Sequence, residues 1–265
     1  MIIEGQKFSG TFVSRPNRFL ALVRINDAVV PCYLPDPGRL KELLLPGAEV
    51  VVRRPIDRGI SSTFSKTSIC KDNANEMRTA EGKHRKTEYD MLAVVASISG
   101  GERQLVSVDT RLPNELVHEA LLNRSLREFN SYGKLTREFC YGSSRLDFLL
   151  EKRYGRGTDK CYLEVKSCSL VEDGVALFPD APTERGSRHL RELMNVKSYN
   201  KNHRASIMFI VQRGDAGSLR PNEGTDPKFA QTLQMALAKG VEAYAYTVNF
   251  NTESMTLARS IPVKA

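Results

Sequence analysis

Three ionisable residues within positions 145–167 have the types and the spacing of a metal-dependent hydrolytic site. Asp147 interrupts one apolar run, and Glu164 and Lys166 interrupt the next, after a polar loop. Charged side chains are costly to bury unless they are paired or bind an ion. Because successive side chains of a strand point to opposite faces, Glu164 and Lys166 share one face.

A hairpin of these two strands would bring Asp147 near Glu164. Two neighbouring carboxylates repel each other unless a cation lies between them, and Mg²⁺ or Mn²⁺ is a suitable cation for oxygen ligands. Lys166 could then orient a water molecule or stabilise the charge that develops on a phosphate, so that a phosphodiester is hydrolysed. The alternative is an ordinary charge pattern, with Glu164 and Lys166 on the wet face of an edge strand.

The elements around these residues alternate in the way that is typical of a parallel sheet with crossover helices. A helix is expected over residues 112–123, with Asn114 as its N-cap. A later helix is expected to begin with the cap Asp226 and with Pro227. Strands are expected at residues 135–142, 144–151, 160–171, 205–213 and 241–248, and helices at 186–200 and 226–240.

The N-terminal part has a different pattern, with closely spaced short strands that predict a small barrel of the oligonucleotide-binding (OB) type. A polar stretch at residues 73–90 is the best domain junction. We therefore expect residues 1–83 to form an OB-like barrel that binds nucleic acid, and residues 84–265 to form an α/β domain with a mixed sheet flanked by helices. The barrel strands are expected at residues 7–13, 18–25, 28–34, 48–54 and 61–69.

The composition indicates which kind of binding partner and which cellular compartment to expect. The net charge of +8, from 39 basic and 31 acidic residues, suits a polyanion such as nucleic acid. Five cysteines with no Cys-x-x-Cys pair predict reduced thiols. The chain has no apolar run of membrane-spanning length and no signal-peptide pattern. We expect a cytoplasmic protein that does not enter membranes, and a homodimer is compatible with the sequence.

Several motifs resemble those of the sugar fermentation stimulation protein family. The resemblance covers nearly the whole chain and is most specific between residues 108 and 193. In the N-terminal part, residues 36–38 (Asp-Pro-Gly) depart from the Asn-Thr-Gly turn of the family. The matching segments are VDTRLPNELVHEAL (108–121), SRLDFLLE (144–151), CYLEVKS (161–167) and FPDAPTERGSRHLREL (178–193), with looser matches at 17–23, 35–40, 225–230 and 240–246.

This resemblance implies an N-terminal OB-like barrel and a C-terminal domain similar to the PD-(D/E)XK nucleases. In that superfamily an Asp, followed by Glu-x-Lys on the next strand, forms the catalytic core, and here these positions are Asp147, Glu164 and Lys166. A preceding helix often supplies another acid, and Glu119 matches that position. The resemblance thus implies these four residues as catalytic, with Asp147, Glu164 and Glu119 as ligands of Mg²⁺ or Mn²⁺. The alternative for Glu119 is a solvated acid.

Basic and aromatic residues are candidates for nucleic-acid contacts. Cations at the start of the helix at 186–200 oppose the helix dipole, and a bound phosphate would offset that conflict. The alternatives are a solvated basic face or pairing with Asp180 and Glu184. Phe19 and Tyr33 could stack on bases or belong to the barrel core, and His189 is either a general base or structural. The expected nucleic-acid-binding residues are Arg18, Arg39, Arg145, Arg185, Arg188 and Arg191.

The leading prediction is a metal-dependent nuclease with an attached nucleic-acid-binding barrel, acting on DNA rather than RNA. A DNA-binding transcriptional regulator of sugar metabolism, without cleavage, is the first alternative. A protein that binds a sugar or another small ligand is the second, although the basic balance and the absence of tryptophan count against it.

Overall fold

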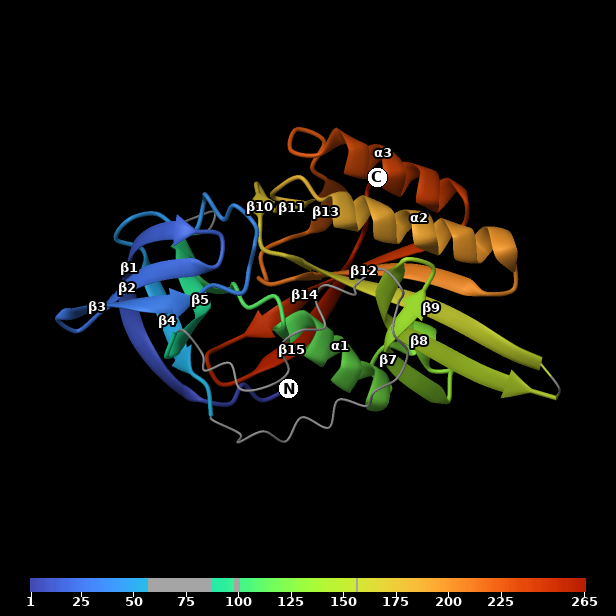
Figure 1. The fold of residues 1–265 in the computed structure, drawn as a ribbon, viewed down its shortest axis with the longest axis horizontal. Helices are drawn as coiled ribbons and strands as arrows, with labels where there is room; N and C mark the ends of the chain where they lie inside the picture. The colour runs from blue at the N-terminus through green and yellow to red at the C-terminus, as the bar shows by residue number, and fades with distance from the viewer. Residues whose placement is uncertain (57–86, 98–100, 156) are drawn as a thin grey trace.

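The computed structural model describes residues 1–56, 87–97, 101–155 and 157–265. Within them the chain forms two six-stranded sheets, one three-stranded sheet and three α-helices (Figure 1). The strand expected at residues 61–69 and the expected domain junction between residues 83 and 84 lie outside the described residues.

The first sheet has the order β3-β2-β1-β4-β5-β6 and forms the left-hand part of the molecule in Figure 1. A further pairing of Cys32 with Tyr89 joins β3 to β5 and makes the sheet ring-like, as an OB-like architecture requires. β5 begins within the polar stretch at 73–90 and β6 follows it, so the first sheet extends beyond residue 83, the expected end of the barrel. The strands are β1 (Gln6–Asn17), β2 (Leu20–Ile25), β3 (Ala28–Tyr33), β4 (Glu49–Arg54), β5 (Tyr89–Ser97) and β6 (Arg103–Ser107).

The second large sheet has the order β15-β14-β12-β9-β8-β7 and holds the expected Glu-x-Lys strand, β9, in its interior. Its strands are parallel from β9 through β12 to β14 and antiparallel on both sides of that core. The predicted mixed sheet is confirmed. The strands are β7 (Lys134–Tyr141), β8 (Ser144–Tyr154), β9 (Gly157–Cys168), β12 (Arg204–Val211), β14 (Glu242–Phe250) and β15 (Met255–Ile261), and a small sheet contains β10 (Val171–Glu172), β11 (Val175–Phe178) and β13 (Ser218–Pro221).

Helices cover both faces of this sheet (Figure 1). Helix α1 (Leu112–Leu122) packs Leu116 and Val117 into a cluster with Leu163 of β9. Helix α2 (Glu184–Tyr199) packs Leu190 against the opposite face, in a cluster with Tyr162 of β9. Helix α3 (Pro227–Ala238) lies beside α2 and belongs to the same cluster, and a short 3₁₀ turn, η1 (Arg127–Phe129), follows α1. Side chains of β9 that alternate along the strand therefore enter two different apolar layers.

Local capping explains where two of the helices begin. The side chain of Asp226 accepts a hydrogen bond from the Phe229 N–H at 2.9 Å, so that the predicted cap of α3 is confirmed. Thr183 caps α2 by accepting from the Gly186 N–H at 3.0 Å. The prediction of Asn114 as an N-cap is wrong: α1 begins two residues earlier, at Leu112, because Pro113 fits the first helical turn.

The loop that contains the turn at residues 36–38 of the N-terminal part contacts the loop between β11 and α2. The Leu40 N–H donates to Asp180 Oδ2 at 3.0 Å, and Asp180 lies between β11 and α2. A Cβ atom at Gly38 would overlap with Asp180 Oδ1, so that no side chain fits there without displacing this carboxylate. The Asp-Pro-Gly turn, which departs from the family pattern, thus has a structural role, because Gly38 leaves the space that the Asp180 carboxylate occupies.

The cysteines only partly match the expectation of reduced thiols. Cys32, Cys161 and Cys168 are free and buried, and burial raises the pKa of the Cys32 and Cys161 thiols to about 12. Cys140 is disulfide-bonded, so the expectation is wrong at that position. Sequence spacing could not reveal this, because a disulfide depends on how closely two cysteines approach in the fold. Among the described helices, none is long and apolar enough to cross a membrane.

Candidate active site

The structure brings Asp147, Glu164 and Lys166 together at the hairpin of β8 and β9. Phe148 of β8 pairs with Leu163 of β9, and this register sets Asp147 beside Glu164. The Val165 N–H donates to Asp147 Oδ2 at 2.7 Å and fixes the aspartate where the strand pairing ends. The pairing of β8 with β9 in the hairpin that the sequence predicts therefore brings the three charged side chains together.

Glu164 is buried, with 2% of its side chain exposed, and its two oxygens have different surroundings. Oε1 accepts hydrogen bonds from Lys166 Nζ and from His189 Nδ1 of α2. Oε2 is buried and has no hydrogen-bond partner among the described residues. Burial alone would raise the pKa of Glu164, but Lys166 and His189 outweigh it and hold the pKa below its ordinary value. Glu164 is thus a carboxylate with one free oxygen.

Asp147 has the opposite electrostatic balance. Burial, together with the negative charge of Glu164, raises the pKa of Asp147 to about 7, although Lys166 and two hydrogen bonds act to lower it. The cost of holding two carboxylates together in a water-poor place is therefore only partly offset by the protein itself. A bound cation would offset the remainder.

Asn114 of α1 is a site residue that the sequence interpretation missed. Its Nδ2 donates to Asp147 Oδ1 at 2.9 Å, while its buried Oδ1 has no hydrogen-bond partner in the described part of the chain. The signal in the sequence is its position three residues before the buried Val117, which places Asn114 on the sheet-facing side of the helix.

Glu119, the predicted third acid, is not brought to this site. It lies five residues beyond Asn114, about 140° around the helix. Its carboxylate pairs with the amino group of Met1 at 3.1 Å, and 52% of the side chain is exposed. This position agrees with the alternative of a solvated acid, because the helix phase that directs Asn114 to Asp147 directs Glu119 elsewhere.

His189, which the sequence leaves as either a base or a structural residue, pairs with Glu164. It is 1% exposed, and burial lowers its pKa, because this effect outweighs the neighbouring Glu164. The imidazole therefore favours the neutral form and donates from Nδ1 to the carboxylate. No spacing between α2 and β9 in the sequence predicts this contact.

The residues present fit a hard divalent cation. The cluster offers two carboxylates, Asp147 and Glu164, and the unpartnered oxygens are Glu164 Oε2 and Asn114 Oδ1. In residues 1–56, 87–97, 101–155 and 157–265, no three His, Cys, Asp or Glu side chains form a group that could hold a metal ion. Mg²⁺ is suited to such a sparse set, because it binds through one or two carboxylates and retains several waters.

The arginines expected to bind nucleic acid are spread over both parts of the molecule. Arg185 and Arg188 are exposed on α2, whereas Arg191 pairs with Glu184 at 3.1 Å. Arg145 pairs with Glu138 at 3.6 Å, both side chains being at least half exposed. Two of these four arginines, Arg145 and Arg191, are thus paired with acidic side chains of the protein itself.

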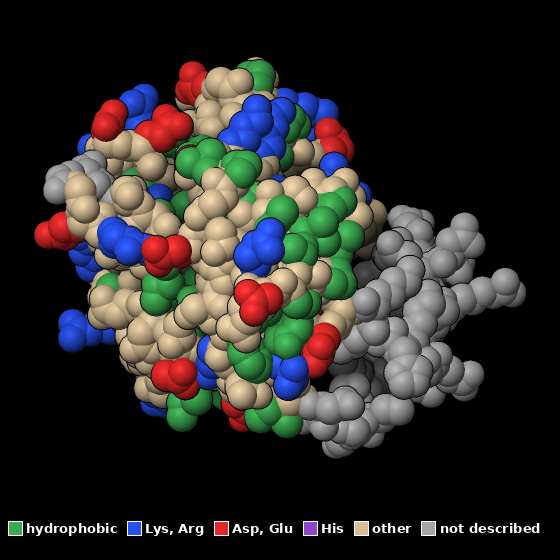
Figure 2. Space-filling model, turned by 90° about the vertical axis from the view of Figure 1, so that its left-hand side faces the viewer, with side chains coloured by type: hydrophobic (Ala, Val, Ile, Leu, Met, Phe, Trp, Pro, Cys, Tyr) green, Lys and Arg blue, Asp and Glu red, His purple; other side chains and the backbone are tan. Residues whose placement is uncertain are grey.

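Arg18 and Arg39, in contrast, are exposed and lie close together in the first sheet's loops, because Arg15 donates to the carbonyls of both residues. Phe19 is 47% exposed and stacks on Tyr33 with a centroid distance of 6.5 Å. Figure 2 shows basic and acidic side chains interspersed over this end of the molecule rather than one continuous basic face.

Comparisons with known proteins cover the whole chain. Residues 111–254 match the family model "Sugar fermentation stimulation protein RE domain", and residues 13–63 match "SfsA N-terminal OB domain". The solved structure of Pyrococcus furiosus SfsA in complex with Ca²⁺ superposes with a TM-score of 0.77 at 27% identity, covering 100% of both chains.

Relatives named "Sugar fermentation stimulation protein homolog" are similar over nearly their full length. The one from Moorella thermoacetica is 45% identical, over 96% of this chain and 95% of its own. The one from Alkaliphilus metalliredigens is 40% identical, over 92% and 90%. The chain therefore belongs to the sugar fermentation stimulation protein family, with an N-terminal OB domain followed by the mixed-sheet domain that holds the candidate site.

Proposed function

We propose that this protein is a divalent-metal-dependent nuclease that hydrolyses phosphodiester bonds in DNA. The observation that carries the proposal is the cluster of Asp147, Glu164 and Lys166, in which Glu164 directs an unpartnered oxygen into a buried, polar place. Two carboxylates and a lysine are an expensive combination to bury without a charged ligand. The two carboxylates and the lysine carry a net charge of −1, which a divalent cation together with one phosphodiester group, net +1, would balance.

The residues that would hold Mg²⁺ or Mn²⁺ are Asp147, Glu164 through Oε2, and Asn114 through Oδ1. Asn114 takes the place proposed for Glu119. The Pyrococcus furiosus relative was solved in complex with Ca²⁺, a cation that also prefers oxygen ligands, and this supports a cation site in the shared fold.

The protein's own groups have distinct roles in this proposal. When bound, the metal ion polarises the phosphate and lowers the pKa of a bound water. His189 holds Glu164 Oε1 and so keeps Oε2 available. Lys166 lies against the same oxygen of Glu164 and moves from it to the negative charge that develops on the phosphate. The Val165 N–H keeps Asp147 in position throughout.

Cleavage of labelled single-stranded and duplex DNA, with Mg²⁺ or Mn²⁺ and with EDTA, tests the proposal. We expect metal-dependent cleavage by the wild type and a loss of at least about 100-fold in Lys166→Ala. Lys152→Ala, at an exposed position on the neighbouring strand β8, is the matched control and should keep wild-type activity. Equal rates in wild type and Lys166→Ala would refute the catalytic role.

A DNA-binding regulator without cleavage is the second candidate, and a different feature favours it. The exposed Phe19, stacked on Tyr33, and the neighbouring Arg18 and Arg39 offer a binding surface that does not include the carboxylates. Salt-sensitive DNA binding that is unchanged by EDTA, together with no metal-dependent cleavage, would favour this candidate.

A further inference from the structure

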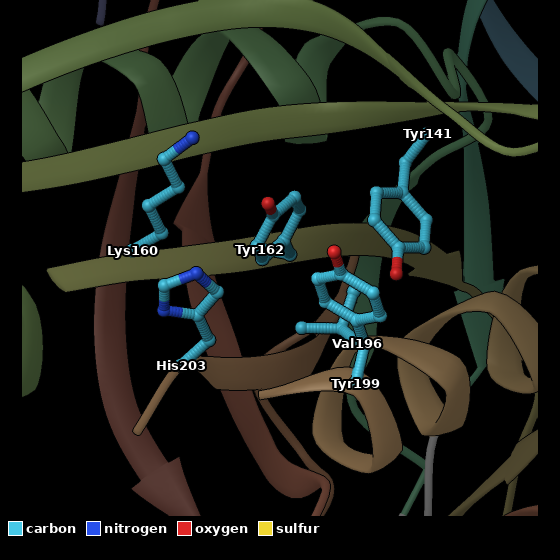
Figure 3. Close-up of a pocket in the computed structure, with 6 residues that line it drawn as sticks. All are labelled: Tyr141, Lys160, Tyr162, Val196, Tyr199 and His203. Atoms are coloured by element: carbon cyan, nitrogen blue, oxygen red, sulfur yellow. The ribbon is translucent and has the colours of Figure 1, made fainter. Parts of the chain in front are cut away.

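A separate pocket of about 270 Å³ lies at the C-terminal end of α2, where that helix meets the beginning of β9 (Figure 3). Its lining is dominated by aromatic rings, and no acidic side chain takes part in it among the described residues. The lining residues are Tyr141, Lys160, Tyr162, Val196, Tyr199 and His203.

The rings come from four different segments and surround a common space (Figure 3). Tyr141 of β7 contacts Tyr162 of β9 edge to face, with ring centroids 5.2 Å apart, and His203 lies 6.1 Å from Tyr162 on another side. Tyr199, at the end of α2, is 89% exposed, so its ring is available to a ligand. Burial raises the pKa of Tyr141 and Tyr162, so that both phenols stay neutral.

The pocket shares two elements, β9 and α2, with the candidate active site. Lys160, Tyr162 and Glu164 occupy alternating positions of β9, so they share one face and Tyr162 lies about 7 Å along the strand from Glu164. On α2, His189 contacts Glu164, and Val196 follows it after two turns, about 10 Å along the axis. The pocket thus lies within a few nucleotides' reach of the carboxylates.

We infer that this pocket binds one unpaired nucleobase of the DNA strand that the active site cleaves. Bases stack on aromatic rings regardless of their identity, and the ammonium of Lys160 at the rim suits the phosphate attached to such a base. A base inside a duplex cannot enter a pocket without leaving the stack. The inference rests on the proposed function and deepens it, since it makes single-stranded or locally unpaired DNA the substrate class.

Binding measured in EDTA, where metal-dependent cleavage cannot occur, tests this inference. The probes are a fluorescent single-stranded oligonucleotide, the blunt duplex of the same sequence and a free nucleoside monophosphate. In Tyr199→Ala we expect affinity for the single strand to fall about 10-fold, with little change for the duplex. Tyr154→Ala removes another exposed tyrosine, at the far end of β8, and should bind both like the wild type.

A second variant, Lys160→Gln, should reduce the salt dependence of single-strand binding by about one phosphate contact. Weak binding of the monophosphate with tight binding of the oligonucleotide identifies the strand as the ligand, whereas tight binding of the monophosphate would overturn that assignment in favour of a free nucleotide. Wild-type affinity of Tyr199→Ala for the single strand, or an equal loss for the duplex, would also overturn the inference. Because these assays measure binding and not cleavage, the two ideas can be refuted separately. Tyr199→Ala can bind like the wild type while Lys166→Ala still abolishes hydrolysis. Conversely, Tyr199→Ala can lose single-strand binding while Lys166→Ala has no effect on hydrolysis.

Discussion

At the scale of single residues, the site is defined by an asymmetry within Glu164. One oxygen contacts both Lys166 and His189, and the other has no partner among the described residues. An unsatisfied buried oxygen is costly, and that cost disappears when a cation binds. Binding of Ca²⁺, Mg²⁺ or Mn²⁺ should therefore stabilise the fold.

This leads to a prediction for Glu164→Gln. At a Ca²⁺ concentration about 100 times the dissociation constant, the wild type should gain roughly 5–10 °C in melting temperature. Glu164→Gln should gain almost nothing, because the amide carries no charge for the cation. Thermal unfolding followed by circular dichroism, with and without Ca²⁺, measures both. Glu119→Gln is the control, since Glu119 pairs with Met1 away from the site, and it should keep the full gain.

Asn114 offers a prediction with opposite signs for two substitutions. Asn114→Ala should weaken Mn²⁺ binding about 10-fold, because it removes both an oxygen and the hydrogen bond to Asp147. Asn114→Asp should strengthen Mn²⁺ binding by adding a third carboxylate. Isothermal titration calorimetry measures both, and a decrease of the same size in both variants would exclude Asn114 as a ligand.

At the scale of elements, Asp226 connects two helices. Its Oδ1 accepts from the Phe229 N–H and caps α3, while its Oδ2 accepts from the Thr183 N–H at 2.7 Å, just before α2. Asp226→Ala should cost about 2 kcal/mol of unfolding free energy, because it removes a cap and leaves a second N–H without its partner. Thr183→Ala removes only one cap and should cost about 1 kcal/mol. Urea unfolding compares the two, and equal costs would contradict a shared role of Asp226.

At the scale of the whole molecule, the free energy of unfolding should respond to pH through the turn at residues 36–38. Asp36, in the turn at residues 36–38, is 8% exposed, and burial, with a smaller effect of Asp180, raises its pKa from 3.8 to about 7. Between these values the folded protein binds the proton more tightly than the unfolded chain does. The stabilising contribution of protonated Asp36 is therefore lost as the pH rises from about 4 to 7.

Asp36→Asn should remove this dependence. Relative to the wild type, its unfolding free energy should increase between pH 5 and pH 8 by on the order of 1–2 kcal/mol. Urea unfolding at both pH values measures the change, and Asp27→Asn, at an exposed position in the β2–β3 turn, serves as the control. A constant difference between wild type and Asp36→Asn would contradict the assigned cause.

Much of the fold and the centre of the site could be predicted from the sequence, because they depend on local patterns. Alternating apolar positions around Glu164 and Lys166 define a strand and its faces, and the Asp226-Pro227 start defines a helix. The contacts of Asn114 and His189 could not be predicted in this way. Each depends on how a helix is rotated and translated against β9, which is decided by packing over the whole sheet.

Gly38 has a consequence for anyone who recombines members of this family. The Asp180 carboxylate occupies the space that a Cβ would need at this position. The residue types at positions 38 and 180 therefore depend on each other, although they are far apart in the sequence. A chimera that takes its first half from one relative and its second half from another must inherit both partners. A larger residue at position 38 beside Asp180 would force that carboxylate to move away from the Leu40 N–H.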